Sequence, residues 1–405
     1  MEAKGAEEYQ VTPVNSFDAL NLKLPLLRGI YGKGFSEPSG IQKLGIKPII
    51  EKKDLLAQAQ SGSGKTATFL IGALQNIDDN SKDQQVLILC HTRELANQIF
   101  REAEEISKLL GTNIALLTGG TSQIAERAKL QSQVQMIIGT PGKVKALLQK
   151  GLINMSTIKM LIIDEADEML SMGFIEQINE IISKLDPNTQ VCFFSATLPE
   201  QIIAMTDQAL QNPVRILVKN ENITLEGINQ YHMKCKDDDE KLQAILTLLE
   251  NSSLSQCFVY FNSKDRCQRV GVALKEKQIP VEFIHGGLEM AERNKIMNDF
   301  RSGTFKILLS TDLLARGIDI TQCGLVINYD LPHNYENYIH RIGRSGRFGR
   351  RGVAINLVSD KELGEMVQIE KFYQTQIDAL PADFNSVINK VDKWINFKSY
   401  SILDF

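Results

Sequence analysis

Short runs of apolar residues alternate with longer segments of helical periodicity along most of the chain. We expect β-strands at Val86–Cys90, Met136–Thr140, Met160–Asp164, Gln190–Ala196, Cys257–Phe261, Ile307–Thr311, Leu325–Tyr329 and Val353–Ser359. Many of these runs are continuously apolar, which is typical of parallel strands buried on both faces. Segments such as Glu94–Leu110 and Leu288–Arg301 favour helices between them. The alternation predicts α/β domains, each with helices on both faces of a parallel sheet.

The length of the chain and a change in its polarity divide this pattern in two. A chain of 405 residues is too long for one core, since domains usually hold roughly 100–200 residues. The chain turns polar after Pro213, and the aperiodic segment Asn220–Tyr231 is interpreted as a linker. The predicted parts are an N-terminal extension (1–15), a first domain (16–212), a linker (213–225), a second domain (226–378) and a C-terminal amphipathic tail (379–405).

The tail has apolar residues at helical spacing and holds the single tryptophan of the chain. These residues are Phe384, Val387, Ile388, Val391, Trp394 and Ile395. Two interpretations stay open: a cap that packs on the second domain, or a helix that docks a partner.

Composition narrows the class of protein. Lys and Arg total 45 against 49 Asp and Glu, a net charge of -4, which argues against coating nucleic acid by bulk positive charge. A local basic groove stays compatible with that average. The six cysteines lack zinc-ligand spacing and are expected to be buried thiols of a reducing compartment. No apolar run reaches the roughly 18–20 residues of a membrane span, and the first residues lack a signal peptide's apolar segment. We therefore expect no membrane association and a location in the cytoplasm or nucleus.

The strongest local signal is a glycine-rich loop between an apolar run and a helix-like segment. It comprises Ala59, Gln60, Ser61, Gly62, Ser63, Gly64, Lys65 and Thr66. Glycines let successive N–H groups point at phosphate oxygens, and the following helix adds its positive N-terminal end. Lys65 is expected to reach the β- and γ-phosphates, and Thr66 to bind Mg²⁺.

An acidic strand end supplies the second half of the predicted nucleotide site. The run Met160–Asp164 delivers Asp164 to the sheet edge where ligands bind, followed by Glu165. Asp164 is expected to hold Mg²⁺, partly through water, and Glu165 to orient and deprotonate the attacking water. These residues alone predict a nucleoside triphosphatase and leave small-molecule kinases, GTPases and motors open.

The letters DEAD at 164–167 and further blocks in matching order identify a resemblance to DEAD-box RNA helicases over about residues 16–378. The sequence is most similar to the translation initiation factor four-A group, judged by FDAL…LLRGIYGKGF, STDLLARGID and ENYIHRIGRSGRFGR. The resemblance implies two tandem RecA-like domains, ATP with Mg²⁺, and RNA bound through its backbone without sequence preference. It also implies a monomer, translation initiation factors as regulators, and local RNA unwinding driven by ATP hydrolysis.

Further roles follow from the resemblance alone. For ATP it implies that Gln42 reads adenine, that Phe35 stacks on the base and that Asp319 contacts the nucleotide; taken singly, Gln42 and Phe35 would pass for core or surface residues. It implies RNA contacts by Arg93, Gly120, Thr140, Pro141, Gly142, Lys143, Asn262, Thr311 and Arg316. Ser195, Thr197 and His340 would couple hydrolysis to strand separation. Arg344 and Arg347 would be arginine fingers that stabilise charge on the γ-phosphate.

The chain departs from the family pattern at several positions. His91 replaces the proline that opens PTRELA, Lys143 replaces the arginine of TPGR, and Gly287 replaces the aspartate of HGD. Met290 precedes Ala291-Glu292-Arg293 where a glutamine is usual, and Tyr335 stands at a common arginine position. We expect these departures to affect RNA affinity more than ATP hydrolysis.

Three rivals to an RNA-dependent ATPase stay open. The first is an ATP-locked RNA clamp of a splicing-linked or ribosome-assembly complex, which shares the motifs. The second is a DNA translocase of the same superfamily, which the Gln42 block and the DEAD spelling oppose. The third is a small-molecule P-loop kinase, which would leave the second domain without a purpose.

Overall fold

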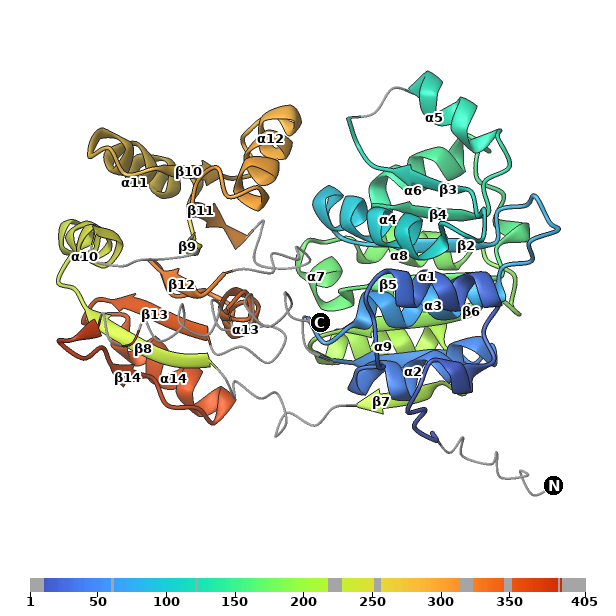
Figure 1. The fold of residues 1–405 in the computed structure, drawn as a ribbon, viewed down its shortest axis with the longest axis horizontal. Helices are drawn as coiled ribbons and strands as arrows, with labels where there is room; N and C mark the ends of the chain where they lie inside the picture. Colours follow the sequence, from blue (N-terminus) through green and yellow to red (C-terminus); the bar gives the residue numbers. More distant parts are fainter. Residues whose placement is uncertain are drawn as a thin grey trace, which may run out of the picture. The chain divides into compact units, whose positions relative to one another are not determined.

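The chain forms two compact units, residues 1–219 and 220–405, each built around a seven-stranded sheet (Figure 1). The computed structural model describes residues 11–59, 62–120, 123–217, 228–250, 256–312, 323–345, 352–384 and 387. The paired strands in both sheets are parallel. The predicted fold class, two tandem parallel α/β domains of the RecA-like kind, is confirmed.

In the first unit, the strands lie side by side in an order that differs from their order in the chain. The order is β3 (Ile114–Leu117), β4 (Met136–Gly139), β2 (Val86–Leu89), β5 (Met160–Asp164), β6 (Gln190–Ser195), β1 (Leu55–Gln58) and β7 (Val214–Leu217). The helices are α1 (Leu24–Gly32), α2 (Gly40–Ile50), α3 (Lys65–Asn76), α4 (Arg93–Ser107), α5 (Gln123–Leu130), α6 (Pro141–Gln149), α7 (Ala166–Ser171), α8 (Ile175–Ile182) and α9 (Glu200–Ala209).

The second unit repeats the same arrangement strand for strand. Its sheet runs β10 (Val281–Ile284), β11 (Ile307–Thr311), β9 (Cys257–Phe261), β12 (Leu325–Asn328), β13 (Gly352–Val358), β8 (Ile228–Lys234) and β14 (Asp378–Ala379). Its helices are α10 (Asp238–Glu250), α11 (Lys264–Glu276), α12 (Met290–Arg301), α13 (Tyr335–Ile342) and α14 (Leu363–Tyr373).

The direction of each connection determines which face its helix covers. From β1 to β3 the chain steps one way along the first sheet, and from β3 to β7 it steps back. Right-handed crossovers therefore place α3 and α4 on one face and α6 to α9 on the other, as Figure 1 shows. The sheet is thus covered on both faces, as the apolar strands require.

The apolar runs of the sequence form the inner strands of the two sheets. All residues of β2, β4, β5, β6, β9, β12 and β13 are buried. Three predicted strands, Met160–Asp164, Cys257–Phe261 and Ile307–Thr311, have the observed bounds. Side chains alternate within β9: Val259 packs in one cluster with Leu274 of α11, and Phe258 packs on the other face with Phe300 of α12.

Two strands lie where the polar sequence predicted a connection. β7 pairs with β1 in the first sheet, although its residues fall in the predicted linker 213–225. β8 pairs with β13 and begins at Ile228, inside the segment Asn220–Tyr231 that polarity indicated as a linker. β7 alternates buried and exposed side chains, and β8 is mostly half-buried, so neither has a continuous apolar run. Residues 218–227 lie outside the described residues.

The start of the predicted tail packs on the second unit. Phe384 and Val387 lie against the apolar cluster between the second sheet and its helices α10 and α11. This contact agrees with the cap interpretation for these two residues. Ile388, Val391, Trp394 and Ile395 lie outside the described residues.

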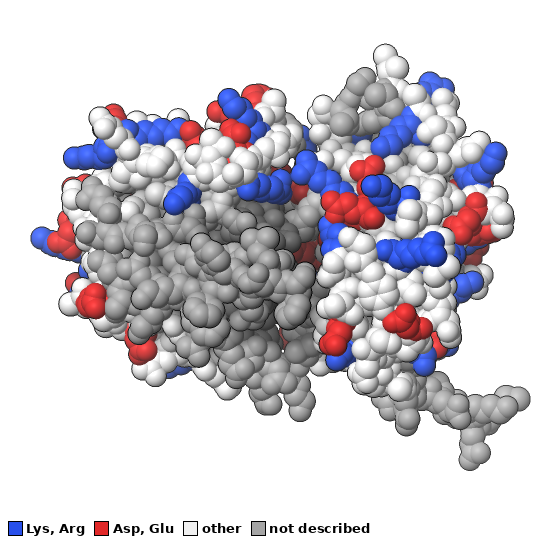
Figure 2. Space-filling model, in the orientation of Figure 1, with Lys and Arg blue, Asp and Glu red and all other residues white. Residues whose placement is uncertain are grey.

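Charge is mixed on the described surface. On the face drawn in Figure 2, Lys and Arg side chains are interspersed with Asp and Glu on both units, as the net charge of -4 predicts. Among the helices that the structure describes, none is both long and apolar enough to cross a membrane.

Gly29 sets the close approach of α1 and α4, and its replacement tests that packing. A Cβ at Gly29 would lie 2.0 Å from the backbone oxygen of Ile106, so Gly29→Ala forces two backbones apart. We expect a loss of about 1–3 kcal/mol in the free energy of unfolding, measured by urea denaturation of the full chain.

Gly32, in the same helix, provides the matched control. Nothing lies within 4 Å of a Cβ built there, so Gly32→Ala is expected to stabilise the protein by about 0.4–1 kcal/mol. Equal effects of the two substitutions would contradict the proposed packing constraint.

Candidate active site

The glycine-rich loop follows β1 at the carboxyl edge of the first sheet. Gly62 and Gly64 have φ angles of 81° and 99°, in the left-handed region that favours glycine. α3 begins at Lys65, directly after Gly64. The N–H groups of its first turn therefore face the loop, as a phosphate site needs. Gln60 and Ser61 lie outside the described residues.

Lys65 is held inside this loop. Its side chain is buried, and Nζ donates a hydrogen bond of 2.7 Å to the carbonyl oxygen of Ala59. The N–H of Ala59 in turn donates to the carbonyl oxygen of Ser195 at the end of β6. The ammonium is thus fixed between two strand ends, and the half-buried Thr66 follows it on α3.

Gln42 braces the same loop. Its Oε1 accepts from the N–H of Ser39, and its Nε2 donates to the carbonyl oxygen of Gly64 at 3.3 Å. Ser39 Oγ donates to the carbonyl oxygen of Ser63. A Cβ at Gly64 would lie 2.6 Å from Gln42 Nε2, and the φ of 99° is one that other residues rarely adopt, so this position favours glycine. Phe35, the predicted stacking residue, is half-buried against the first unit's core.

β5 carries the two predicted acids to the same edge. Asp164 is its last residue, and Glu165 follows with φ 52° and ψ 55°, a left-handed conformation that is uncommon outside glycine. The N–H of Glu165 donates to Asp164 Oδ1 at 3.0 Å, and both side chains are buried. His91, which follows β2 and Cys90, has its Nδ1 3.3 Å from Glu165 Oε2.

Burial and a neighbouring negative charge both change the pKa of Asp164. Burial, followed by the charge of Glu165, raises the pKa of Asp164 from its ordinary value to about 7, although Lys65 lowers it. Asp164 therefore lacks enough positive charge within the protein itself. A divalent cation held with Thr66 would supply that charge, and hydroxyl and carboxylate oxygens are ligands that suit Mg²⁺.

Asp167 ties the DEAD segment to the end of β6. Its Oδ2 accepts hydrogen bonds from the N–H and the Oγ1 of Thr197, at 3.1 and 2.9 Å. Its own N–H donates to Ser195 Oγ. Ser195 and Thr197 were predicted as coupling residues, whereas no role was predicted for Asp167. The feature of the sequence that could have indicated a role for Asp167 is its place as the last acid of the DEAD motif.

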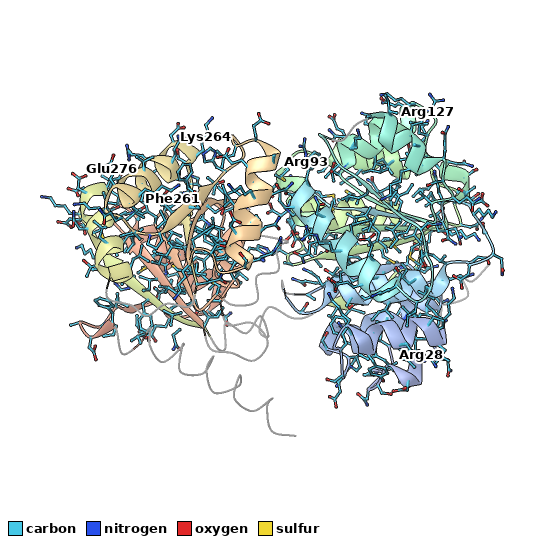
Figure 3. The ribbon with its side chains drawn as sticks, turned by 45° about the horizontal axis from the view of Figure 1, so that its top comes forward. Arg28, Arg93, Arg127, Phe261, Lys264 and Glu276 are labelled. Atoms are coloured by element: carbon cyan, nitrogen blue, oxygen red, sulfur yellow. The ribbon has the colours of Figure 1, made fainter. Side chains whose placement is uncertain are left out.

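The predicted RNA-contacting residues of the first unit follow the carboxyl ends of the neighbouring strands β2, β3 and β4. Arg93, at the start of α4 in Figure 3, lies against the turn after β3. A Cβ at Gly119 would lie 2.3 Å from its guanidinium, and Gly120 has a φ of 87°. Thr140 follows β4 directly and is the N-terminal cap residue of α6, with Pro141, Gly142 and Lys143 in the first turn. These residues share the carboxyl edge with Asp164.

In the second unit, Arg341 organises the corresponding edge. Its buried guanidinium donates to Asp312 at 2.6 and 3.0 Å, to Asn262 Oδ1 at 2.7 Å and to the carbonyl oxygen of Asp330. Asn262, a predicted RNA contact, also donates to the carbonyl oxygen of Leu331. Arg341 was missed, although it lies within the recognised HRIGR block.

The remaining predicted residues of the second unit divide into two groups. Thr311 ends β11, His340 lies on α13, and the buried Arg344 donates from Nε to the carbonyl oxygen of His340 at 3.2 Å. Arg316, Asp319 and Arg347 lie outside the described residues.

The HGG departure forms a compact turn. The N–H of Gly287 donates to His285 Nδ1 at 3.1 Å, and burial, followed by the charge of Lys264, lowers the pKa of His285. The hydrogen bond from Gly287 makes Nδ1 of this ring an acceptor. Tyr335 accepts a hydrogen bond at its carbonyl oxygen from the hydroxyl of Tyr373, so it packs with α14.

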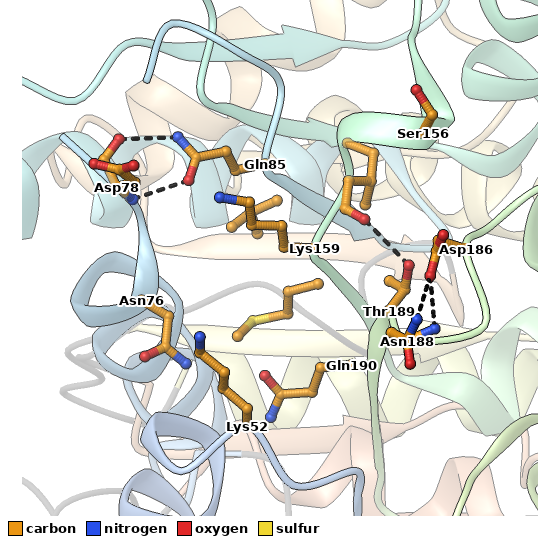
Figure 4. A pocket seen from close by; sticks show the side chains of 13 residues that line it. Lys52, Asn76, Asp78, Gln85, Ser156, Lys159, Asp186, Asn188, Thr189 and Gln190 are labelled. Carbon is orange, nitrogen blue, oxygen red and sulfur yellow. Dashed lines mark hydrogen bonds between the residues drawn. The ribbon is translucent and has the colours of Figure 1, made fainter. Parts of the chain in front are cut away.

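A pocket of about 480 Å³ lies elsewhere on the first unit (Figure 4). Val86, Met160 and Gln190 line it, and these are the first residues of β2, β5 and β6. It therefore opens at the amino edge of the sheet, opposite Asp164. Wall amides such as Gln190 Nε2, which donates to the carbonyl oxygen of Lys53, already bond to protein.

Comparison with known proteins agrees with this arrangement. Residues 39–205 match the DEAD/DEAH box helicase family, and residues 240–349 match the helicase conserved C-terminal domain. The chain is 49% identical over 376 residues to the ATP-dependent RNA helicase eIF4A of Debaryomyces hansenii. The matched residues make up 93% of this chain and 95% of that protein. This chain belongs to the DEAD-box family. It is an ATP-dependent RNA helicase, as the motifs predicted.

Further relatives and solved structures agree. The eIF4A of Candida albicans is 49% identical over 374 residues, which are 92% of this chain and 94% of that protein. The structure of S. cerevisiae Dbp5 bound to RNA and ADP BeF3 superposes with a TM-score of 0.88 at 32% identity, over 94% of this helicase and 99% of Dbp5. Mss116p bound to ssRNA and AMP-PNP gives a TM-score of 0.82 at 26% identity, over 92% of this chain and 81% of that one.

The raised pKa of Asp164 predicts a dependence of stability on pH in protein free of nucleotide and Mg²⁺. The fold favours the protonated carboxyl, whereas the unfolded chain ionises near the ordinary value of 3.8. Stability is therefore lost as the pH rises from there through about 7. We expect Asp164→Asn to stabilise the protein at pH 8 by up to about 4 kcal/mol.

Urea unfolding of both proteins at pH 5 and pH 8, in EDTA, measures this effect. The advantage of the Asn variant should shrink at pH 5, where wild-type Asp164 is protonated. An advantage that is equal at both pH values would show that Asp164 is ionised throughout.

Proposed function

We propose that this helicase hydrolyses ATP at the carboxyl edge of its first sheet and uses the cycle to remodel RNA locally in translation initiation. The juxtaposition of Lys65, Asp164 and Glu165 carries the catalytic part: Lys65 lies close enough to lower the pKa of Asp164, and Glu165 is the next residue. The identity of 49% with proteins named eIF4A supports the role in translation.

Each group has a distinct task in this proposal. Lys65 neutralises the β- and γ-phosphates, and Thr66 and Asp164 hold Mg²⁺, which supplies Lewis-acid charge stabilisation when bound. Glu165 orients the attacking water and accepts its proton. Arg344 and Arg347 add guanidinium charge at the γ-phosphate, with Asp319 nearby. Gln42 and Phe35 contact adenine, which requires Gln42 to release one of its two bonds to the protein.

RNA is held through its backbone at the strand ends. The contacts in this proposal come from Arg93, Gly120, Thr140, Pro141, Gly142, Lys143, Asn262, Thr311 and Arg316. Contacts to phosphates and 2′-hydroxyls make binding independent of sequence and select RNA over DNA. Ser195, Thr197 and His340 couple this grip to hydrolysis. The protein acts as a monomer in the cytoplasm, with translation initiation factors as its regulators.

Two substitutions separate catalysis from nucleotide binding. Glu165→Gln removes the base and is expected to lower RNA-stimulated kcat by about 100-fold or more, with ATP affinity within a few-fold of wild type. Lys65→Ala removes phosphate contacts and is expected to weaken ATP binding as well. Phosphate release at saturating RNA and binding of a fluorescent ATP analogue measure both quantities.

Two controls belong to this experiment. Single-stranded DNA of the same sequence should stimulate wild-type turnover far less than RNA. In a translation extract depleted of the protein, wild type but not Glu165→Gln should restore initiation. Unchanged turnover in Glu165→Gln would refute the catalytic assignment, and initiation that is unaffected by depletion would refute the role in translation.

The contact between Arg93 and the glycine pair predicts an effect on RNA binding. Gly119→Ala places a Cβ on the Arg93 guanidinium and is expected to displace it, weakening RNA affinity by about 10-fold because a charge-assisted bond is lost. Fluorescence anisotropy with labelled RNA measures this. Gly364→Ala on α14, where a Cβ meets nothing within 4 Å, is the control; equal affinities for the two variants would exclude Arg93 from the RNA site.

A further inference from the structure

His91 is buried beside the predicted catalytic glutamate. Its side chain is 3% exposed and that of Glu165 is 5% exposed, with Nδ1 and Oε2 3.3 Å apart. The two atoms are within ion-pair distance, although their angles fall short of a hydrogen bond. Water is nearly absent from both side chains, so an interaction between them is weakly screened.

The surroundings of Glu165 are mostly negative. Asp164 precedes it, and the charges of Asp164, Glu165 and Glu94 all act on the buried thiol of Cys90, next to His91. Carboxylates this close repel one another. Among the contacts described for the Glu165 carboxylate, that with the imidazole of His91 is the one that brings a nitrogen able to donate a hydrogen bond within reach.

The backbone conformation of Glu165 does not by itself fix the position of its carboxylate. The left-handed conformation of Glu165 fixes the direction in which its side chain leaves the chain, but the carboxylate still rotates about its own torsions. A general base must lie within hydrogen-bond reach of its water. The imidazole restricts the carboxylate from the side of β2.

We propose that His91 is a positioning residue for Glu165: its Nδ1 holds the carboxylate in place for the attack of water on ATP. The inference rests on the proposed role of Glu165 as the base. The proline of the family pattern has no side-chain nitrogen and could not make this contact.

A purely structural role for His91 makes the opposite prediction about two substitutions. Leucine keeps most of the volume of histidine but has no donor, whereas asparagine keeps a donor near the position of Nδ1 but loses volume. If His91 only filled space, the Leu variant would be at least as active as the Asn variant.

We expect His91→Leu to lower RNA-stimulated kcat by about 10-fold, with KM for ATP within about twofold, because a loosely held base is less often in place. His91→Asn should stay within about threefold of wild-type kcat, since a neutral amide gives a weaker but directed contact with a carboxylate. His232→Leu is the control: this histidine lies on β8, where Nδ1 is 3.1 Å from the carbonyl oxygen of Ile377, and its loss should leave kcat unchanged.

Glu165→Gln measured in parallel separates this inference from the proposed function. Wild-type turnover in Glu165→Gln would refute the base itself. A strong loss in Glu165→Gln together with wild-type kcat in His91→Leu would overturn only the role of His91. An Asn variant no better than the Leu variant would also overturn it, because packing would then explain the loss.

Discussion

Parallel pairing of every described strand pair is the constraint on which both candidate sites depend. Because the strands run in one direction, their carboxyl ends meet at one edge, and each following loop begins there. In the first unit this brings Lys65, Asp164, Ser195 and Thr140 to a shared edge, from positions far apart in the sequence. The second unit has the same strand order, so Asn262, Thr311 and Arg341 gather at the equivalent place.

Such an edge has an electrostatic cost. The strands deliver acids into an interior that solvates charge poorly, and the raised pKa of Asp164 reflects this. The second unit resolves the same problem internally, because Arg341 pairs with Asp312 and bonds to Asn262 and to the backbone. The first unit has Lys65 but more acids, which leaves its edge suited to a cation-bearing phosphate ligand.

The sequence predicted most of the fold because the inner strands are continuously apolar. β7 and β8 were missed since one face of β7 is exposed and β8 is only partly buried, so their residues are polar enough to resemble a connection. For the site, the motifs indicated which residues matter but not how they contact one another. The bonds from Gln42 to Gly64 and from Thr197 to Asp167 span 22 and 30 residues. Only the packing of α2, β6 and α7 against the glycine loop and β5 brings these pairs together.

The structure separates the departures from the family pattern by the kind of contact that each residue makes. The sequence favoured an effect on RNA affinity, and Lys143, in the first turn of α6, fits that interpretation. His91 does not, because its ring lies against Glu165 and not on the surface. An exposed substitution mainly alters a partner's contacts, whereas a buried polar side chain must be stabilised by its neighbours or act on them. At this position the neighbour is Glu165, the base of the proposed function, so under that proposal the departure concerns ATP hydrolysis before it concerns RNA.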